Sequence, residues 1–237
     1  MMRTPVNATP DSAAPGSRCA RGLAAVTLGA LAALAPAAVG AAEFSGFAST
    51  GPLGVILFQP CEGKTLSPRT FRVEDNTPDG ALMAGIDDVR AIMLNSGRPL
   101  YVEFRGDAKG ILVTARQFQR AVGTAESCID APRDIPAAVR FWAAGGDPGW
   151  RFVVAGQGAQ LERPGERPVR FPAAPFLAPS RGEGMRVIDA WSPLDGGTVR
   201  VEIIEQMCSD GRSETAYGAT VMLRYGSRSY EGCAARF

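Results

Sequence analysis

The stretch that decides the fold is Thr70–Gly106, TFRVEDNTPDGALMAGIDDVRAIMLNSGRPLYVEFRG. Its two ends, Thr70–Glu74 and Leu100–Arg105, have the composition of short strands. Between them, apolar residues recur at spacings of four, three and four: Leu82, Ile86, Val89 and Met93. This period places them on one face of a helix, for which Thr77-Pro78 is the expected start and Asn95-Ser96-Gly97 the expected end.

Further strands are expected on both sides of this stretch. Phe44–Ser49 and Leu53–Phe58 precede it around a Gly-Pro turn, and Ile111–Phe118 follows it. Three strands, one helix and two strands are the order of a five-stranded OB-type barrel, in which the helix closes one end. Aromatic residues at alternating strand positions are then expected in the barrel core: Phe44, Phe47, Phe58, Phe71, Tyr101, Phe104 and Phe118.

The second half of the chain is also rich in predicted strands. Eight short apolar runs follow one another between turn residues: Val139–Ala143, Trp150–Ala155, Ala159–Glu162, Val169–Phe171, Met185–Trp191, Thr198–Ile204, Ala219–Arg224 and Ser229–Glu231. This pattern predicts an antiparallel barrel or sandwich. The expected fold is therefore mainly β, with an OB-like domain over residues 43–130, a proline-containing linker over 131–138 and a second β domain over 139–237.

A leader precedes these domains. Residues 1–21 are polar and end on Arg18 and Arg21, whereas residues 22–39 carry no charge. This order predicts a secretory signal peptide over residues 1–42, with a mature chain that begins near Ala42 or Glu43 in the periplasm. An uncleaved membrane anchor is the alternative, because about 17 apolar residues can span a bilayer.

Cysteine usage agrees with export. Cys19 lies in the leader, and four cysteines remain in the mature chain, which indicates disulfides in an oxidising compartment. Four cysteines allow three pairings. We favour Cys61 with Cys128 and Cys208 with Cys233, because each bridge then stays within one half of the chain. Free redox-active thiols are the alternative, although the sequence has no C-x-x-C spacing.

Composition excludes several classes of function. The 237 residues include no histidine, so neither a Ser-His-Asp or Cys-His relay nor an imidazole metal ligand can form. The chain has 25 basic and 24 acidic residues, and loss of the leader leaves 22 and 23. A dedicated nucleic-acid-binding protein carries a clear basic excess. We therefore expect no enzyme activity, no cofactor, no metal site and no nucleic-acid partner, but an unidentified protein or small ligand of the cell envelope.

Two loops are the candidates for binding. In Gly145–Trp150 a glycine-rich turn meets a large aromatic residue, and a turn followed by a core tryptophan is the alternative. The second loop follows Cys208 and would be preorganised by a disulfide at its base, unless that bridge only staples a small barrel. The candidate residues of the two loops are Asp147 and Trp150, and Asp210, Gly211, Arg212, Ser213 and Tyr217.

The second half also matches a known pattern: Gly-Asn-Glu-Pro-Phe-Trp, Cys-Ser-Asp-Gly-Met-Ser, Tyr-Pro and a final Gly-Cys-Ala. The matching residues are Gly146, Pro148, Trp150, Cys208, Ser209, Asp210, Gly211, Ser213, Tyr217, Gly232, Cys233 and Ala234. Gly149, Arg212 and Gly218 depart from it. In this respect the chain resembles a family of exported bacterial proteins described as membrane- or lipoprotein-like.

The first half is similar to the OB domain of envelope copper-tolerance and stress-signalling lipoproteins, through Cys61 and residues 100–106. These resemblances imply an envelope protein without established catalysis. Ser213 and Tyr217 also stand four residues apart, as in the loop of membrane-associated inhibitors of c-type lysozyme, which insert that loop into the lysozyme cleft. The chain lacks the tryptophan and the Lys-Gly pair that follow in those inhibitors.

Carboxylates offer the remaining route to catalysis. Glu202 and Glu205 lie three apart on an expected strand, so they should face opposite sides of the sheet. Asp87 and Asp88 belong to the polar face of the helix, where solvation explains them. The sequence thus favours an exported binding or envelope-homeostasis protein. The alternatives are an inhibitor of c-type lysozyme and a carboxylate-based hydrolase acting on envelope glycans, which would need two carboxyl groups about 5–9 Å apart in a cleft.

Overall fold

The computed structural model describes most of the chain beyond residue 40. It covers residues 41–94, 97–130, 135–136, 138–146, 149–156, 158–172, 178–179, 185–211 and 213–235. Within these ranges the chain is mainly β and has one α-helix, as predicted. The predicted leader lies almost entirely outside the described residues. No helix within them is long and apolar enough to cross a membrane.

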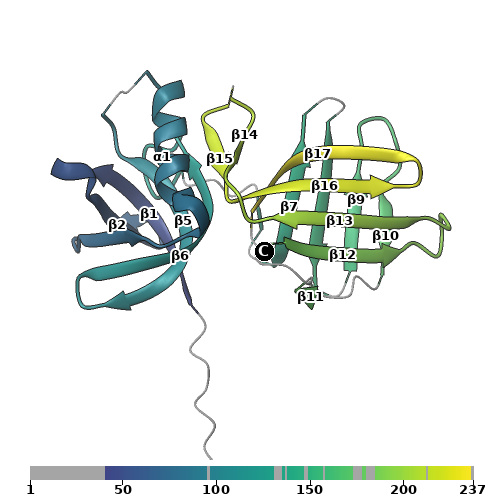
Figure 1. The fold of residues 1–237 in the computed structure, drawn as a ribbon, viewed down its shortest axis with the longest axis horizontal. Coiled ribbons are helices and arrows are strands. Elements are labelled where there is room, and N and C mark those ends of the chain that lie inside the picture. Colours follow the sequence, from purple (N-terminus) through teal and green to yellow (C-terminus); the bar gives the residue numbers. More distant parts are fainter. Residues whose placement is uncertain are drawn as a thin grey trace, which may run out of the picture. The chain divides into compact units, whose positions relative to one another are not determined.

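Five strands of the first sheet pair in a closed ring (Figure 1). Their bounds are β1 (Ala42–Thr50), β2 (Ile56–Glu62), β4 (Phe71–Asp75), β5 (Leu100–Lys109) and β6 (Leu112–Val122). The ring runs β1-β2-β4-β6-β5 and returns to β1, with a parallel β4–β6 pairing and antiparallel pairings elsewhere. With the helix between β4 and β5, this order is the one predicted for an OB-type barrel.

The barrel core is built as the sequence predicts. Helix α1 (Ala81–Ile92) buries Leu82, Ile86 and Val89 against Phe58, Phe104 and Phe118. Gly85 lets the helix approach, because a Cβ at this position would lie 2.5 Å from the Phe118 ring. Two of the expected core aromatics, Phe47 and Tyr101, instead form a separate buried cluster with Val122, Ala125 and Cys128.

The start of the helix differs from the expectation. Thr77 begins a 3-10 turn, η2 (Pro78–Gly80), and α1 begins after it. Thr77 still caps the helix, because its Oγ1 accepts a hydrogen bond from the Leu82 N–H at 3.2 Å. Asp75 adds a second cap by accepting from the Met83 N–H at 2.8 Å. Two of the four N–H groups that have no partner within the helix are thereby satisfied.

The strand expected over Leu53–Phe58 begins later. Leu53 lies in a second 3-10 turn, η1 (Pro52–Gly54), and has a φ of 62°, which no strand residue adopts. The strand β2 therefore starts at Ile56. A short strand that the sequence pattern did not predict, β3 (Thr65–Leu66), extends the edge of β2 at Cys61 and Glu62.

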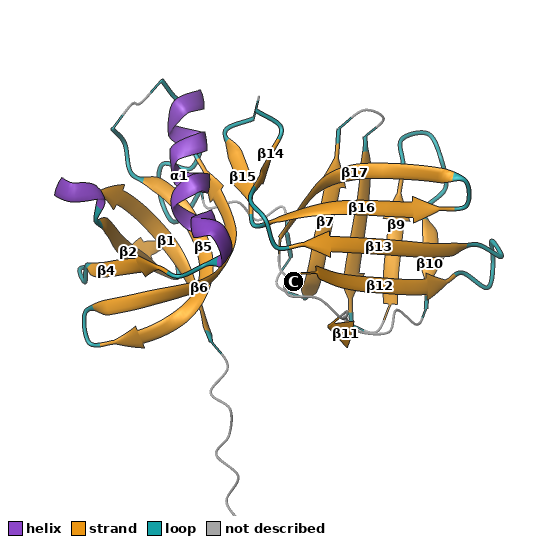
Figure 2. Ribbon diagram, viewed as in Figure 1, coloured by secondary structure: helices purple, strands orange, loops and turns teal. Residues whose placement is uncertain are grey.

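The second sheet contains the eight predicted strands of the second half, with bounds shifted by a few residues at most, and one additional short strand. They are β7 (Val139–Gly145), β8 (Trp150–Ala155), β9 (Gly158–Glu162), β10 (Val169–Phe171), β11 (Ala178–Pro179), β12 (Met185–Trp191), β13 (Thr198–Ile204), β16 (Ala219–Tyr225) and β17 (Arg228–Ala235). The order is β10-β9-β8-β7-β17-β16-β13-β12-β11, antiparallel throughout. Figure 2 shows β12, β13, β16 and β17 crossing the layer formed by β7–β10.

The second core lies between these two layers. Strands β7–β10 contribute Phe141, Phe152, Leu161 and Phe171, and the other layer contributes Ile188, Val201, Val221 and Leu223. Alternation along each strand explains this, since every second side chain points into the core. The other side chains of β7–β10 face outward, and they form the surface on which the candidate site lies.

Candidate functional site

The candidate loop after Cys208 is a small hairpin that pairs with the first sheet. Its strands β14 (Cys208–Ser209) and β15 (Thr215–Tyr217) lie between β13 and β16 in the sequence, but β15 pairs with β6 rather than with either of them. The strand pairing therefore crosses the division expected between residues 43–130 and 139–237. A three-residue strand that leaves one sheet for another carries no recognisable period, so sequence reasoning missed this exchange.

The turn of this hairpin is held by local hydrogen bonds. Asp210 Oδ1 accepts from both the N–H and the Oγ of Ser213, at 2.8 and 2.9 Å. Gly211 has a φ of 65° and donates its N–H to Ser209 Oγ at 3.0 Å. Ser213 and Gly211 are exposed. Arg212, the remaining candidate in this turn, lies outside the described residues.

Both predicted disulfides are present. Cys61 is bonded to Cys128 with a Cα–Cα distance of 5.7 Å, and Cys208 to Cys233 with 5.5 Å. Cys208 and Cys233 both lie in the second half of the chain, so this bridge was expected to stay within one β domain. It joins β14, which belongs to the first sheet, to β17 of the second sheet, so it ties the two sheets together.

Tyr217 connects the hairpin to the outer face of the second sheet. Its ring stacks on that of Trp142 in β7, with centroids 5.3 Å apart and planes 27° apart. Together with Ile135, Val139 and Ala235, Trp142 forms a small buried cluster against which Tyr217 packs. Tyr217 is thus part of a packed junction, whereas Ser213 lies in the exposed turn at the other end of β15.

The structure requires glycine at Gly218, a position where the chain departs from the sequence pattern that its second half resembles. A Cβ here would lie 1.8 Å from the Phe118 carbonyl oxygen, and the Gly218 N–H donates to the Gln119 carbonyl at 2.8 Å. A proline has no N–H to donate to the Gln119 carbonyl, and its side chain would clash with the Phe118 carbonyl oxygen. The chain therefore needs glycine at a position where the resembled pattern has proline.

The other candidate loop places its aromatic residue in the core. Trp150 is 5% exposed, its ring lies 6.0 Å from that of Tyr230, and its Nε1–H donates to the Glu231 carbonyl at 3.2 Å. This is the core-tryptophan arrangement that was the alternative to a binding role. Asp147, the second candidate of this loop, lies outside the described residues.

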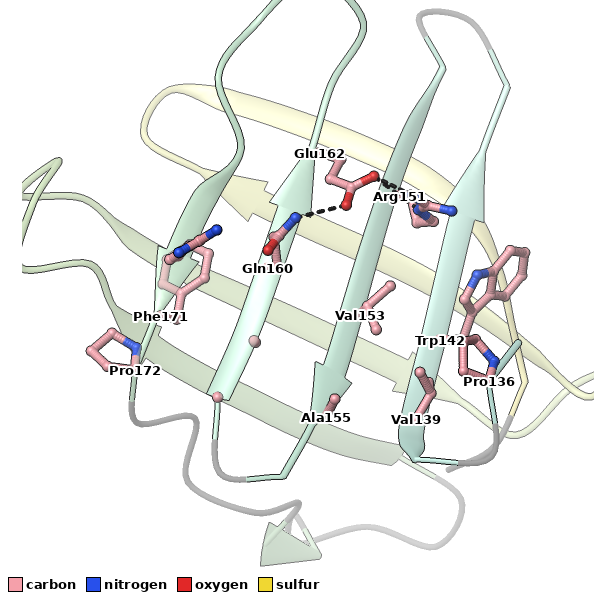
Figure 3. A pocket seen from close by; sticks show the side chains of 13 residues that line it. Pro136, Val139, Trp142, Arg151, Val153, Ala155, Gln160, Glu162, Phe171 and Pro172 are labelled. Atoms are coloured by element: carbon pink, nitrogen blue, oxygen red, sulfur yellow. Dashed lines mark hydrogen bonds and ion pairs between the residues drawn. The ribbon is translucent and has the colours of Figure 1, made fainter. Parts of the chain in front are cut away.

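A groove that the sequence did not suggest lies on the outer face of β7–β10 (Figure 3). Its volume is about 470 Å³. Residues that stand opposite one another on the four adjacent strands form rows across the sheet. One row consists of Trp142, Val153, Gln160 and Arg170. The next row bears Val139, Ala155 and Gly158, and Pro172 follows at its end. Ala155 and Gly158 are small, so the second row is lower in the middle than at its ends, and this difference creates the hollow.

Polar side chains border the groove on the side of the first row. Glu162 accepts from Arg151 Nε at 3.0 Å through one oxygen and from Gln160 Nε2 at 2.7 Å through the other. A second guanidinium nitrogen of Arg151 also donates to Glu162. Figure 3 shows this chain of three residues above the apolar floor. Both oxygens of the carboxylate are therefore already engaged.

One signal in the sequence could have indicated the groove. Phe152-Val153-Val154-Ala155 is apolar at successive positions, whereas a strand with one solvated face alternates apolar and polar residues. Phe152 and Val154 fill the core, so Val153 and Ala155 leave apolar surface on the outer face. The hollow itself depends on which residues stand opposite one another on four strands, and this information is not local in the sequence.

The carboxylates named from the sequence lie elsewhere. Glu202 pairs with Arg200 at 2.9 Å, and this hydrogen bond lowers its pKa. Glu205 pairs with Arg186 at 2.6 Å. Asp87 is exposed on α1 and Asp88 is half-buried there. None of the four lines the groove, and in the described part of the chain no cluster of three cysteine or acidic residues could hold a metal ion.

Comparison of the chain with models of protein families, with curated proteins and with solved structures gave no match.

Proposed function

We propose that this chain is an exported protein of the cell envelope that binds the apolar part of a ligand or partner in the groove on β7–β10. The groove carries this proposal. Its volume of about 470 Å³ falls within the range of roughly 300–1,000 Å³ that is usual for ligand sites, which are mostly apolar with a few polar groups. Val153 and Ala155 form the apolar floor of this groove, and the hydrogen-bonded side chains of Arg151, Glu162 and Gln160 supply the few polar groups at its border.

Export is supported by the leader pattern and by the cysteines. All four cysteines beyond the leader are paired in the structure, as in proteins that fold in an oxidising compartment. The resemblance of the second half to exported membrane- or lipoprotein-like proteins agrees with this compartment. A binding function without catalysis requires no feature of the molecule besides the groove. Inhibition of c-type lysozyme through Ser213 and Tyr217 remains a prediction.

An enlarged side chain in the groove tests the proposal. Ala155 is exposed and small, so Ala155→Phe should fold normally and fill the hollow. We expect the parent protein to bind the neutral fluorescent probe N-phenyl-1-naphthylamine, and Ala155→Phe to weaken this binding by roughly tenfold, since most of the apolar contact is lost. The measurement is a fluorescence titration of the mature protein.

The matched control is Thr198→Phe, which makes the same kind of enlargement at an exposed position of β13 outside the groove. Circular dichroism of both variants checks that each is folded. A parent protein that does not bind the probe, or equal binding by the parent and both variants, would contradict the proposal.

A further inference from the structure

The second row of lining residues gives the groove a direction. Val139, Ala155 and Gly158 follow one another across three adjacent strands, and Pro172 stands at the far side (Figure 3). Adjacent strands lie about 4.8 Å apart, so the backbones of β7 and β10, which carry the two raised ends of this row, lie about 14 Å apart. The low floor at Ala155 and Gly158, between these two ends, can hold part of an extended hydrocarbon chain.

The charges that line the groove do not cancel. Its described lining includes two guanidinium groups, Arg151 and Arg170, and one carboxylate, Glu162. Both oxygens of Glu162 are occupied by Arg151 and Gln160. Arg170 stands opposite Gln160 on the edge strand β10 and is exposed. The groove therefore has a positive excess on the same side as its polar border.

We infer that the groove takes a monoanionic amphiphile of the fatty-acid type, an extended hydrocarbon chain with a carboxylate head. This inference rests on the proposed function of the groove. The hydrocarbon chain of this ligand lies over Ala155 and Gly158 beside Val139, where it displaces water from apolar surface. The carboxylate accepts charge-assisted hydrogen bonds from Arg170, which are stronger than those between neutral groups.

Three probes with the same hydrocarbon chain test the inference: dodecanoate, dodecanol and dodecyltrimethylammonium. Each is titrated into the mature protein at concentrations below micelle formation, with isothermal calorimetry as the measurement. We expect dodecanoate to bind roughly tenfold more tightly than dodecanol, and dodecyltrimethylammonium to bind most weakly. Arg170→Gln should reduce the affinity for dodecanoate to that for dodecanol.

Arg224→Gln is the matched control, because it removes an exposed guanidinium from the outer face of β16, outside the groove. It should leave all three affinities unchanged. Equal affinities for the three heads would overturn the carboxylate inference and leave the groove as a neutral apolar site. Binding of N-phenyl-1-naphthylamine without binding of any dodecyl probe would overturn the whole ligand class. Failure of every probe, the naphthylamine included, would reject the proposed function as well.

Discussion

Arg120 is the most unusual single residue of the described chain, since its guanidinium is 1% exposed. It makes two hydrogen bonds to Glu103, of 2.9 and 3.0 Å, and Tyr101 donates its hydroxyl to the same carboxylate at 2.8 Å. Arg120 also stands opposite Tyr217 of the hairpin. A charge buried this deeply must keep its partners, so this cluster holds the register of β5 and β6.

The Tyr101 hydroxyl gives this cluster a measurable pH dependence. Burial first, and then the charge of Glu103, raise the pKa of Tyr101 well above its ordinary value. The folded state therefore keeps the phenol proton at a pH where the unfolded chain loses it. The contribution of the protonated Tyr101 hydroxyl to the free energy of unfolding is fully present below about pH 10 and is lost as pH rises further.

We expect urea unfolding to show this loss. Between about pH 8 and about pH 10.5 the parent protein should lose more stability than Tyr101→Phe, because the variant has no phenol to ionise. Tyr230→Phe serves as the comparison, since it removes a tyrosine of the other core. A parallel pH dependence of the parent protein and Tyr101→Phe would show that the buried hydroxyl does not titrate as argued.

Among the elements, helix α1 depends on residues that precede it. Asp75 accepts hydrogen bonds from the Met83 N–H, the Thr77 N–H at 3.0 Å and the Thr77 hydroxyl at 2.6 Å. It thereby holds Thr77 in position to accept from Leu82. The end of β4 and the start of α1 are consequently one hydrogen-bonded unit, although the 3-10 turn η2 separates them.

Removal of this cap should weaken the first domain. We expect Asp75→Ala to lower the free energy of unfolding by about 1–2 kcal/mol, as is usual for the loss of a helix cap. Chemical denaturation is the measurement. Asp87→Ala, on the exposed face of the same helix, should change stability by less than about 0.5 kcal/mol. A similar effect of the two substitutions would argue against the capping role.

For the molecule as a whole, the hairpin is the part that connects the two sheets. It pairs with β6 over three residues, is bonded to β17 through Cys208–Cys233 and stacks Tyr217 on Trp142. Trp142 in turn walls the groove. The second disulfide thus secures a segment that touches the first sheet, the second sheet and a wall of the candidate site.

Loss of that disulfide should loosen the hairpin selectively. On the chain-entropy model, replacing Cys208 and Cys233 with serine should cost about 3.5 kcal/mol. Amide hydrogen exchange of β15 should accelerate, whereas the centre of β13, in the second core, should stay protected. The pair Cys61→Ser and Cys128→Ser is the control, because its bridge joins β2 to the loop that follows β6 and does not involve the hairpin. Unchanged exchange in β15 would show that the strand pairing alone holds the hairpin.

Much of the architecture followed from local patterns. The spacing of Leu82, Ile86 and Val89 predicted the helix and its buried face, and the order of strands predicted the ring of pairings. The runs Trp150–Ala155 and Met185–Trp191 match observed strands at both ends. Local patterns did not predict the candidate site. Trp150, a predicted binding residue, belongs to the core, and no local pattern was used to predict the groove.

The sequence by itself determined the mainly β fold and the helix, because apolar period and turn residues act within short stretches. The even cysteine count indicated disulfides, and the preference for bridges within each half of the chain selected the two pairs that the structure contains. Only the tertiary structure decided that the hairpin pairs with β6, that its disulfide joins the two sheets and that Ala155 and Gly158 meet in a groove. These features arise from contacts between residues far apart in the chain. Strand register sets such contacts, and no local pattern encodes them.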